Sequence, residues 1–189
     1  MTKLLIPKPT NMNRLFFALD ISSTDKEHIA KWRESHVKLD AKPIKKENFH
    51  ITLAFLGEVN LKQQAHLIES SHNYWQQHFH NNNQCFKLII QDLDLFRKPQ
   101  VLYLGFESFP NRLIRLAEFL KQAAQQQGIK QEERPYLPHI SIYRKAKIAP
   151  LEIALNLTLH CTSFSLYHSQ STANGVTYTP VKTWSLTQD

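Results

Sequence analysis

Phe49-His50-Ile51-Thr52-Leu53-Ala54-Phe55 and Pro138-His139-Ile140-Ser141-Ile142-Tyr143 are two short segments built on one plan. In each, a histidine is followed two residues later by a hydroxyl residue, and apolar residues fill the alternate positions. Because successive side chains of a strand point to opposite faces, each histidine shares a face with its hydroxyl partner. The apolar residues of the opposite face are expected in a core, namely Ile51, Leu53, Phe55, Ile140 and Ile142.

Two histidines, each beside a hydroxyl, are what phosphodiester cleavage without a metal requires. One imidazole acts as general base, the other as general acid, and hydroxyl donors hold the phosphate between them. Histidine suits both roles because its ordinary pKa, about 6.5, lets neutral and protonated forms coexist near neutral pH. A single histidine on a strand is more often structural. The repetition of the pattern favours a catalytic pair, His50 and His139.

Composition bounds the class of protein. The 189 residues, 42% of them hydrophobic, suffice for one large domain or two closely packed lobes. A net charge of +7 is compatible with a polyanionic partner. Cys85 and Cys161 have no Cys or His at metal-ligand spacing, so we expect free, buried thiols rather than a zinc site or a disulfide.

Residues 1–13 are expected to form a loose N-terminal extension. Their longest apolar run, Leu4-Leu5-Ile6, is too short for the core of a signal peptide or for a membrane span. We therefore expect a cytoplasmic protein without membrane association, whose folded domain occupies residues 14–189.

Strand and helix signals alternate along that domain. Apolar runs predict strands at 14–20, 85–96 and 101–107, and two more in the tail at 155–168 and 176–186. Helical spacing and end signals predict helices from Ser22 or Ser23 to about Val37, over 61–79, and from Pro110 to Gly128. Each histidine segment then follows a strand and a helix, Phe17 preceding His50 much as Leu104 precedes His139. This weak duplication predicts two related lobes, with the histidine strands side by side at a central cleft.

The flanks of the two motifs resemble a known family, the two-histidine phosphoesterases. Within it, the chain is most similar to the RNA 2′,3′-cyclic phosphodiesterases, also called the 2′-5′ RNA ligase family. The similarity runs from Arg14 to about Leu186, and the segments that carry it are Arg14-Leu-Phe-Phe-Ala18, Asn48-Phe-His-Ile-Thr-Leu-Ala-Phe-Leu-Gly-Glu58, Phe96-Arg-Lys-Pro-Gln-Val-Leu-Tyr-Leu-Gly105, Glu133-Arg-Pro-Tyr-Leu-Pro-His-Ile-Ser141, and Leu166-Tyr-His-Ser169 with the later Tyr178. The resemblance implies an α+β fold of two pseudo-symmetric lobes, with antiparallel sheets lining a central cleft and helices packed outside.

The resemblance also implies roles for individual residues. His50 and His139 match the catalytic pair, Thr52 and Ser141 the phosphate-binding hydroxyls, and Arg144 an arginine that follows the second motif. Strict alternation places Arg144 on the face opposite His139, so a solvated surface charge is its alternative reading. Tyr143 stands where the family commonly has a small residue. Both Tyr143 and Phe16 are candidates to stack a base, although core packing is the stronger expectation for Phe16.

The implied function is hydrolysis of RNA 2′,3′-cyclic phosphate ends to 2′-phosphomonoesters, by a monomer without metal or other cofactor. In our hypothesis His139 deprotonates the water and His50 protonates the departing 3′-oxygen. The same chemistry run backwards would form a 2′-5′ linkage. Two alternatives stay open: a two-histidine phosphodiesterase acting on a nucleotide or a 2′-5′ oligonucleotide, and a non-catalytic module that binds RNA ends.

Overall fold

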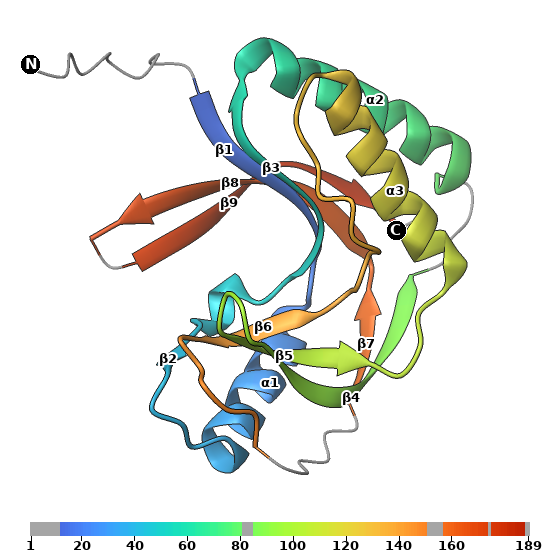
Figure 1. Cartoon of the computed structure of the whole chain (residues 1–189). Coiled ribbons are helices and arrows are strands. Elements are labelled where there is room, and N and C mark those ends of the chain that lie inside the picture. Colours follow the sequence, from blue (N-terminus) through green and yellow to red (C-terminus); the bar gives the residue numbers. More distant parts are fainter. Residues whose placement is uncertain (1–11, 81–84, 151–156, 174, 188–189) are drawn as a thin grey trace, which may run out of the picture.

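The computed structural model describes residues 12–80, 85–150, 157–173 and 175–187. Over these residues the chain forms two antiparallel sheets with helices outside them (Figure 1). The strands are β1 (Met12–Leu19), β2 (Lys42–Pro43), β3 (Ile51–Asn60), β4 (Phe86–Phe96), β5 (Val101–Phe106), β6 (Ile140–Arg144), β7 (Leu157–Cys161), β8 (Ser163–Thr172) and β9 (Gly175–Ser185). The helices are α1 (Ser23–His36), α2 (Leu61–His78), α3 (Asn111–Gln126) and the short 3₁₀ turn η1 (Lys46–Asn48). The predicted α+β class is confirmed.

The two sheets divide the histidine motifs between them. Among the described strands, one sheet has the order β3-β1-β8-β9 and the other β2-β6-β5-β4-β7. Strand β3 pairs with β1, and Leu19 lies opposite Ile51. Strand β6 pairs with β5, and Leu104 lies opposite Ile140. This pairing supports the duplication but shifts it by two residues, because Leu104 corresponds to Leu19 in the structure and to Phe17 in the sequence comparison. The motif strands β3 and β6 are not hydrogen-bonded neighbours, contrary to the expected side-by-side placement.

The helices begin and end where the sequence signals predict. The Ser22 hydroxyl accepts a hydrogen bond from the Asp25 amide at the start of α1, and Asn60 and Gln63 form a capping box at the start of α2. Helix α3 follows Pro110, and Gly128, with φ of +73°, takes the left-handed conformation just beyond its end.

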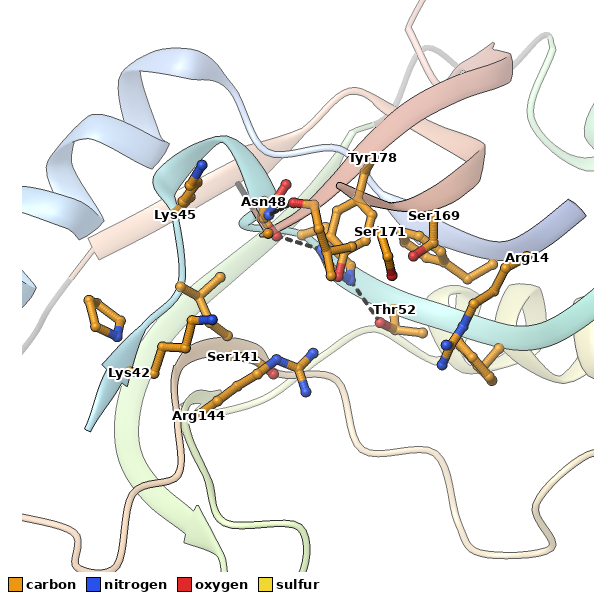
Figure 2. Close-up of a pocket in the computed structure, with 17 residues that line it drawn as sticks. Arg14, Lys42, Lys45, Asn48, Thr52, Ser141, Arg144, Ser169, Ser171 and Tyr178 are labelled. Carbon is orange, nitrogen blue, oxygen red and sulfur yellow. Dashed lines mark hydrogen bonds between the residues drawn. The ribbon is translucent and has the colours of Figure 1, made fainter. Parts of the chain in front are cut away.

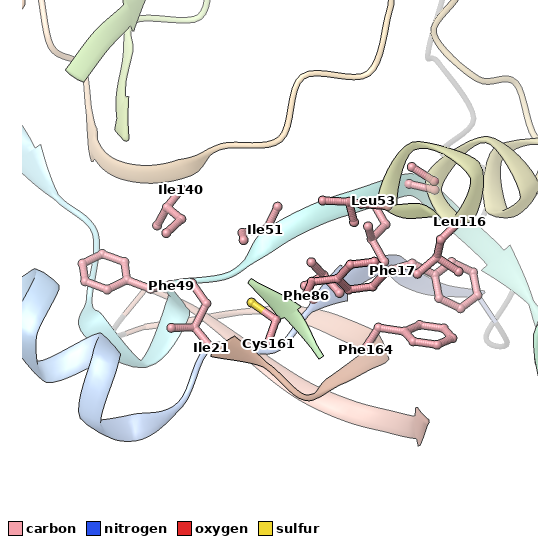
Figure 3. Close-up of a cluster of buried hydrophobic side chains, with 14 of the residues drawn as sticks. Phe17, Ile21, Phe49, Ile51, Leu53, Phe86, Leu116, Ile140, Cys161 and Phe164 are labelled. Atoms are coloured by element: carbon pink, nitrogen blue, oxygen red, sulfur yellow. The ribbon is translucent and has the colours of Figure 1, made fainter. Parts of the chain in front are cut away.

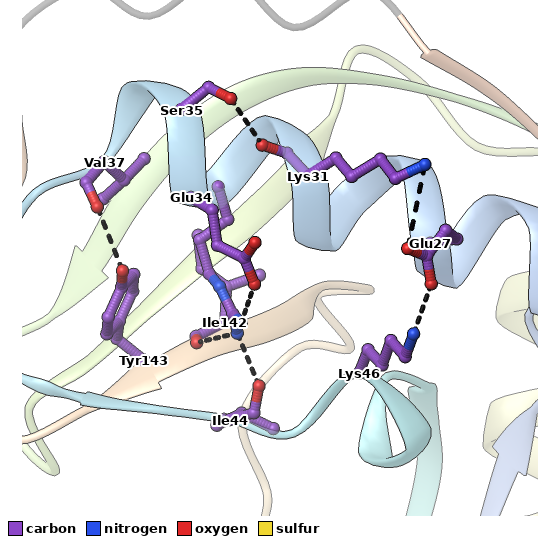
Figure 4. A network of polar contacts seen from close by, with 10 residues as sticks. Glu27, Lys31, Glu34, Ser35, Val37, Ile44, Lys46, Ile142 and Tyr143 are labelled. Carbon is purple, nitrogen blue, oxygen red and sulfur yellow. Dashed lines mark hydrogen bonds and ion pairs between the residues drawn. The ribbon is translucent and has the colours of Figure 1, made fainter.

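The helices cover the outer sides of the sheets (Figure 1). Helices α2 and α3 pack together beside β3, whereas α1 lies below the sheet that contains β6. The buried Arg33 of α1 donates hydrogen bonds to the backbone oxygens of Ile44 and Ile142, which Figure 4 shows beneath the helix. A helix from the first half of the chain thereby supports the strand of the second histidine.

The apolar faces of the motif strands build the core between sheets and helices (Figure 3). Ile51, Leu53, Ile140 and Ile142 are each at most 1% exposed, as alternation predicts. Cys161 is a buried free thiol within this core, where burial raises its pKa to about 12. Cys85 is also free but only half-buried, so the expectation of two buried thiols holds for one of them.

The two ends of the chain depart from the sequence expectation. Strand β1 begins at Met12, and residues 1–11 of the predicted extension lie outside the described residues. The tail forms three strands rather than two, because the predicted strand at 155–168 breaks at Thr162. Its first part, β7, pairs with β4 of one sheet and its second part, β8, with β1 of the other.

Candidate active site

Both histidines sit immediately before their strands and are held by the same local contact. His50 precedes β3, and its Nδ1 lies 2.7 Å from the backbone oxygen of Asn48. His139 precedes β6, and its Nδ1 lies 2.8 Å from the backbone oxygen of Leu137. A carbonyl oxygen only accepts, so in each ring Nδ1 carries the proton and donates it. The Nε2 atom of each neutral imidazole is left as the site that takes or gives a proton.

His50 is packed among aromatic rings. The Phe16 ring lies 4.9 Å from the imidazole centroid, and the Tyr178 ring meets it edge-on at 5.2 Å. Phe16 is itself only 3% exposed and stacks on Tyr167 at 5.3 Å. These contacts fix the plane of the imidazole. The Thr52 hydroxyl lies 3.1 Å from His50 Nε2, on the other side of the ring from Asn48 (Figure 2).

His139 has an equivalent aromatic support. Phe96 and Tyr103 both meet its ring at steep angles, with centroid distances of 4.9 and 5.4 Å. The Tyr103 hydroxyl donates to Asp94 at 3.1 Å, which fixes that ring in turn. Arg134 lies over the other aromatic partner, with its guanidinium carbon 5.9 Å from the Phe96 centroid.

Burial lowers the pKa of both histidines. Loss of hydration lowers the pKa of His50 to about 4, against the smaller opposing effect of its hydrogen bond to Asn48. Positive charge on Lys26, and to a smaller extent on His139 and Arg144, lowers the pKa of His50 further. Burial also lowers the pKa of His139 below its ordinary value of 6.5. In the unliganded protein both rings are therefore neutral at neutral pH.

A cavity of about 520 Å³ opens in front of His50 (Figure 2). Thr52 lines it from the first motif, and Ser141 and Arg144 line it from the second. The cavity thus joins the two sheets. His139 is not among the side chains that line the cavity. It lies two residues before Ser141, which does line it, and directly before strand β6.

A bulge directly after the hydroxyl residue of each motif strand changes which side chains face the cavity, and β3 has a second irregularity beyond Phe55. Between β1 and β3, Ala18 pairs with Thr52 and Phe17 with Ala54, so Leu53 is a bulge. Between β5 and β6 the pairing likewise skips Ile142. A bulge reverses the alternation beyond it, and this resolves the position of Arg144, which lies on the cavity side with Ser141.

The same bulges overturn two sequence expectations. Phe55 was expected in the core with Ile51, but it is 51% exposed and lines the cavity. Tyr143 was expected at the substrate, but it is 7% exposed and its hydroxyl donates to the backbone oxygen of Val37 at 3.0 Å (Figure 4). Tyr143 is therefore a core residue. Phe16 does line the cavity, where it supports the His50 ring.

The cavity wall also holds residues that the motifs did not single out as ligands. Asn48 holds His50 through its backbone oxygen, and its side chain donates to the backbone oxygen of Val176 at 2.8 Å, which ties η1 to β9. Arg14, Ser169 and Tyr178 lie in segments that carry the family resemblance, yet alternation alone gave them no role. Ser171 and Val176 left no signal in the sequence, and Phe55 was assigned to the core. The complete described lining consists of Arg14, Phe16, Lys42, Pro43, Ile44, Lys45, Asn48, His50, Thr52, Phe55, Ser141, Arg144, Ser169, Ser171, Gly175, Val176 and Tyr178.

Comparison with known proteins places this geometry in a family. Residues 20–183 match the family model described as the AKAP7 2′5′ RNA ligase-like domain. An Escherichia coli protein named RNA 2′,3′-cyclic phosphodiesterase is 35% identical over 178 residues, which are 93% of this chain and 97% of that protein. The chain belongs to the 2′-5′ RNA ligase family.

Solved structures of this family share the whole fold. The apo crystal structure of E. coli LigT has a TM-score of 0.81 and 32% identity, over 95% of this chain and 100% of that one. Its complex with 3′-AMP has a TM-score of 0.78 at 32% identity, over 94% and 99% of the two chains. The bilobed α+β architecture predicted from the sequence is thus that of the 2′-5′ RNA ligase family.

The described residues hold neither a metal-binding cluster nor a membrane-spanning helix. They contain no group of three or more His, Cys, Asp or Glu side chains that could hold a metal ion. None of the helices in the described part of the chain is long and apolar enough to cross a membrane.

Proposed function

We propose that this protein is an RNA 2′,3′-cyclic phosphodiesterase that opens the cyclic phosphate to a 2′-phosphomonoester. The observation that carries the proposal is the matched pair of imidazoles, each with Nδ1 bound to a backbone oxygen and Nε2 left for proton transfer. The hydroxyls of Thr52 and Ser141 and the guanidinium of Arg144 line one cavity with His50, and His139 lies two residues before Ser141. The name of the E. coli relative supports the same activity.

The proposed reaction is an in-line displacement at phosphorus. His139 Nε2 takes a proton from water, the water oxygen forms a bond to phosphorus, and the bond from phosphorus to O3′ breaks. His50 Nε2 gives its proton to O3′, so the product is a 2′-phosphate and a 3′-hydroxyl. Each proton transfer contributes on the order of 10²- to 10⁴-fold. Thr52, Ser141 and Arg144 stabilise the charge on the phosphoryl oxygens through preorganised donors.

In this scheme His50, the general acid, takes up its proton when the anionic substrate binds. Both imidazoles are neutral in the unliganded protein at neutral pH because burial lowers their pKa values. A phosphodiester anion close to an imidazole favours the charged ring and raises its pKa. Binding of the anion therefore supplies the state in which one ring is protonated and the other is not.

Product analysis tests the proposed function. RNA ending in a 2′,3′-cyclic phosphate is incubated with the protein, with and without a chelator, and the terminal monoester is identified. We expect 2′-phosphate in both samples. A 3′-phosphate, or loss of activity with chelator, would contradict the mechanism. Tight binding without turnover would favour the RNA-end-binding module, and faster cleavage of a 2′-5′-linked oligonucleotide would favour the alternative substrate class.

A substrate whose leaving group needs no protonation distinguishes the roles of the two histidines. A 4-nitrophenyl phosphodiester of a nucleoside releases a phenolate that needs no general acid. We expect His50→Ala to retain far more activity on this ester than on the cyclic phosphate, whereas His139→Ala should be impaired on both. Selective retention in His139→Ala instead would exchange the two roles.

Three further properties stay predictions of the sequence. We propose that the protein acts as a monomer, needs no metal, and works in the cytoplasm on RNA or oligonucleotide ends. We also propose that residues 14–189 function as one unit of two lobes. Formation of a 2′-5′ linkage by the reverse reaction would follow from the same proton transfers on a 5′-hydroxyl RNA end.

A further inference from the structure

Phe55 is a large apolar side chain that the fold holds at the cavity rather than in the core. The bulge at Leu53 turns it there, three residues beyond Thr52 on β3, and half of its surface is exposed. Three residues extend about 10 Å along a strand, so Phe55 lies beyond the phosphate position but on the same wall. An exposed aromatic ring in a nucleotide site offers a surface on which a base can stack.

Two contacts fix this ring in place. The Arg14 guanidinium carbon lies 5.3 Å from the centroid of Phe55, so a cation covers part of the ring. The side-chain amide of Gln131, only 9% exposed, donates to the backbone oxygen of Phe55 at 3.0 Å. Gln131 belongs to the segment that leads into the second motif. The Arg14–Phe55 surface, defined by these two side chains, is therefore preorganised by both halves of the chain.

The charge of the cavity exceeds what one cyclic phosphate requires. Among its described lining residues, Arg14, Lys42, Lys45 and Arg144 are cationic and none is acidic. Figure 2 shows Arg14 beyond Thr52 on one side of the cavity, and Lys42 and Lys45 on the other. A cyclic mononucleotide carries a single phosphodiester charge, whereas each additional nucleotide adds another. Cations spread over both sides favour a substrate with more than one phosphate.

We propose that the Arg14–Phe55 surface binds the nucleotide on the 5′ side of the cyclic phosphate. The base of this penultimate nucleotide stacks on the layered pair, and its phosphate lies near Arg14. The site then selects RNA ends of two or more nucleotides over cyclic mononucleotides. A chain that ends in a cyclic phosphate has neighbours only on its 5′ side, so no other adjacent nucleotide competes for this surface. The inference rests on the proposed function.

The experiment measures a ratio, kcat/KM for a dinucleotide cyclic phosphate over kcat/KM for the matching cyclic mononucleotide. Stacking of one base changes such a ratio by roughly 5- to 150-fold, so we expect at least about tenfold for the unmodified protein. Phe55→Leu keeps an apolar side chain but removes the ring, and the ratio should fall at least about fivefold, to the preference that Arg14 alone provides. Phe55→Trp keeps a stacking surface and should preserve the ratio. Ile148→Ala, an exposed apolar residue outside the cavity lining, is the matched control.

A binding measurement separates failure of this inference from failure of the proposed function. Titration calorimetry with mono- and dinucleotides that end in 2′-phosphate needs no turnover. We expect the dinucleotide to bind about tenfold more tightly, and Phe55→Leu to reduce this difference several-fold even if the protein proved inactive on cyclic phosphates. Equal ratios in the unmodified protein and Phe55→Leu, by kinetics and by binding, would overturn the inference.

Discussion

The two histidine motifs use one backbone design for two different surfaces. In both, Nδ1 of the histidine binds the carbonyl two residues earlier, two aromatic rings support the imidazole, and a bulge follows the hydroxyl residue. Three residues beyond the hydroxyl, the first motif presents Phe55 and the second Arg144. In the proposed mechanism, the shared part positions proton transfer. The part that differs provides an aromatic surface on one wall and a cation on the other.

Replacing either histidine is the strongest test of their equivalence. We expect His50→Ala and His139→Ala each to lower kcat on a cyclic phosphate by about 10²- to 10⁴-fold, because each removes one proton transfer. His28→Ala, an exposed helix position, is the control and should keep full activity. Near-normal turnover in one of the motif variants, with the fold verified by circular dichroism, would show that the motifs are not functionally equivalent.

The hydroxyl partners should matter less than the histidines. Thr52→Val and Ser141→Ala each remove one donor to the phosphate, and a hydrogen bond to a charged group is worth about 1.5–3 kcal/mol. We expect kcat/KM to fall about 10- to 100-fold in each. Ser141→Thr restores the side chain of the first motif and should stay within a few-fold of the unmodified protein. A large loss in that variant would mean that the second wall has no room for the methyl group.

The pH dependence probes the electrostatic difference between the motifs. Activity of the free protein needs one neutral and one protonated imidazole. As pH rises, kcat/KM increases through the lower pKa, about 4 at His50, and decreases through that of His139, which lies below 6.5, because the pair holds a single proton only between them. With His50 as the acid, that proton lies on the ring with the lower pKa, so the active form is the minor one of the singly protonated pair. We expect the maximum of kcat/KM between these values. A maximum above pH 7 would contradict the effect of burial on the two rings.

The smallest expected effect concerns Tyr143, which has a core position in the second motif strand. Tyr143→Phe removes its hydrogen bond to the Val37 oxygen and should lower the free energy of unfolding by about 1 kcal/mol. Chemical denaturation measures this change, and kcat/KM measured beside it should be unchanged. A marked loss of activity would indicate that Tyr143 contacts the substrate after all.

Much of the fold was predictable because periodicity and end signals carry it. Ser22 and Asn60 begin helices, Gly128 follows one, and the apolar residues of each motif other than Phe55 lie in the core. The proximity of the two motifs to one cavity was inferred from their repetition. Local patterns of this kind predict the ends of a helix and the buried face of a helix or strand.

What the sequence concealed depends on pairing between strands. A bulge adds one residue to one strand only, so the residue types of Leu53 and Ile142 do not indicate it. The two bulges nevertheless place Phe55 and Arg144 at the cavity and Tyr143 in the core. Strict alternation fails from that residue onward. The break at Thr162 was hidden for a similar reason, since β7 and β8 have similar patterns but different partners.

The crossing at Thr162 has a consequence for how the protein loses its structure. The chain leaves one sheet through β7 and completes the other through β8 and β9, while β2 from the first half joins the sheet of the second. No single scission between the motifs would yield two self-sufficient fragments. We expect both lobes to melt in one cooperative transition. A fragment truncated before β7 would lose β8, which pairs with β1, and β9 beside it, so we expect His50 to stop functioning in that fragment.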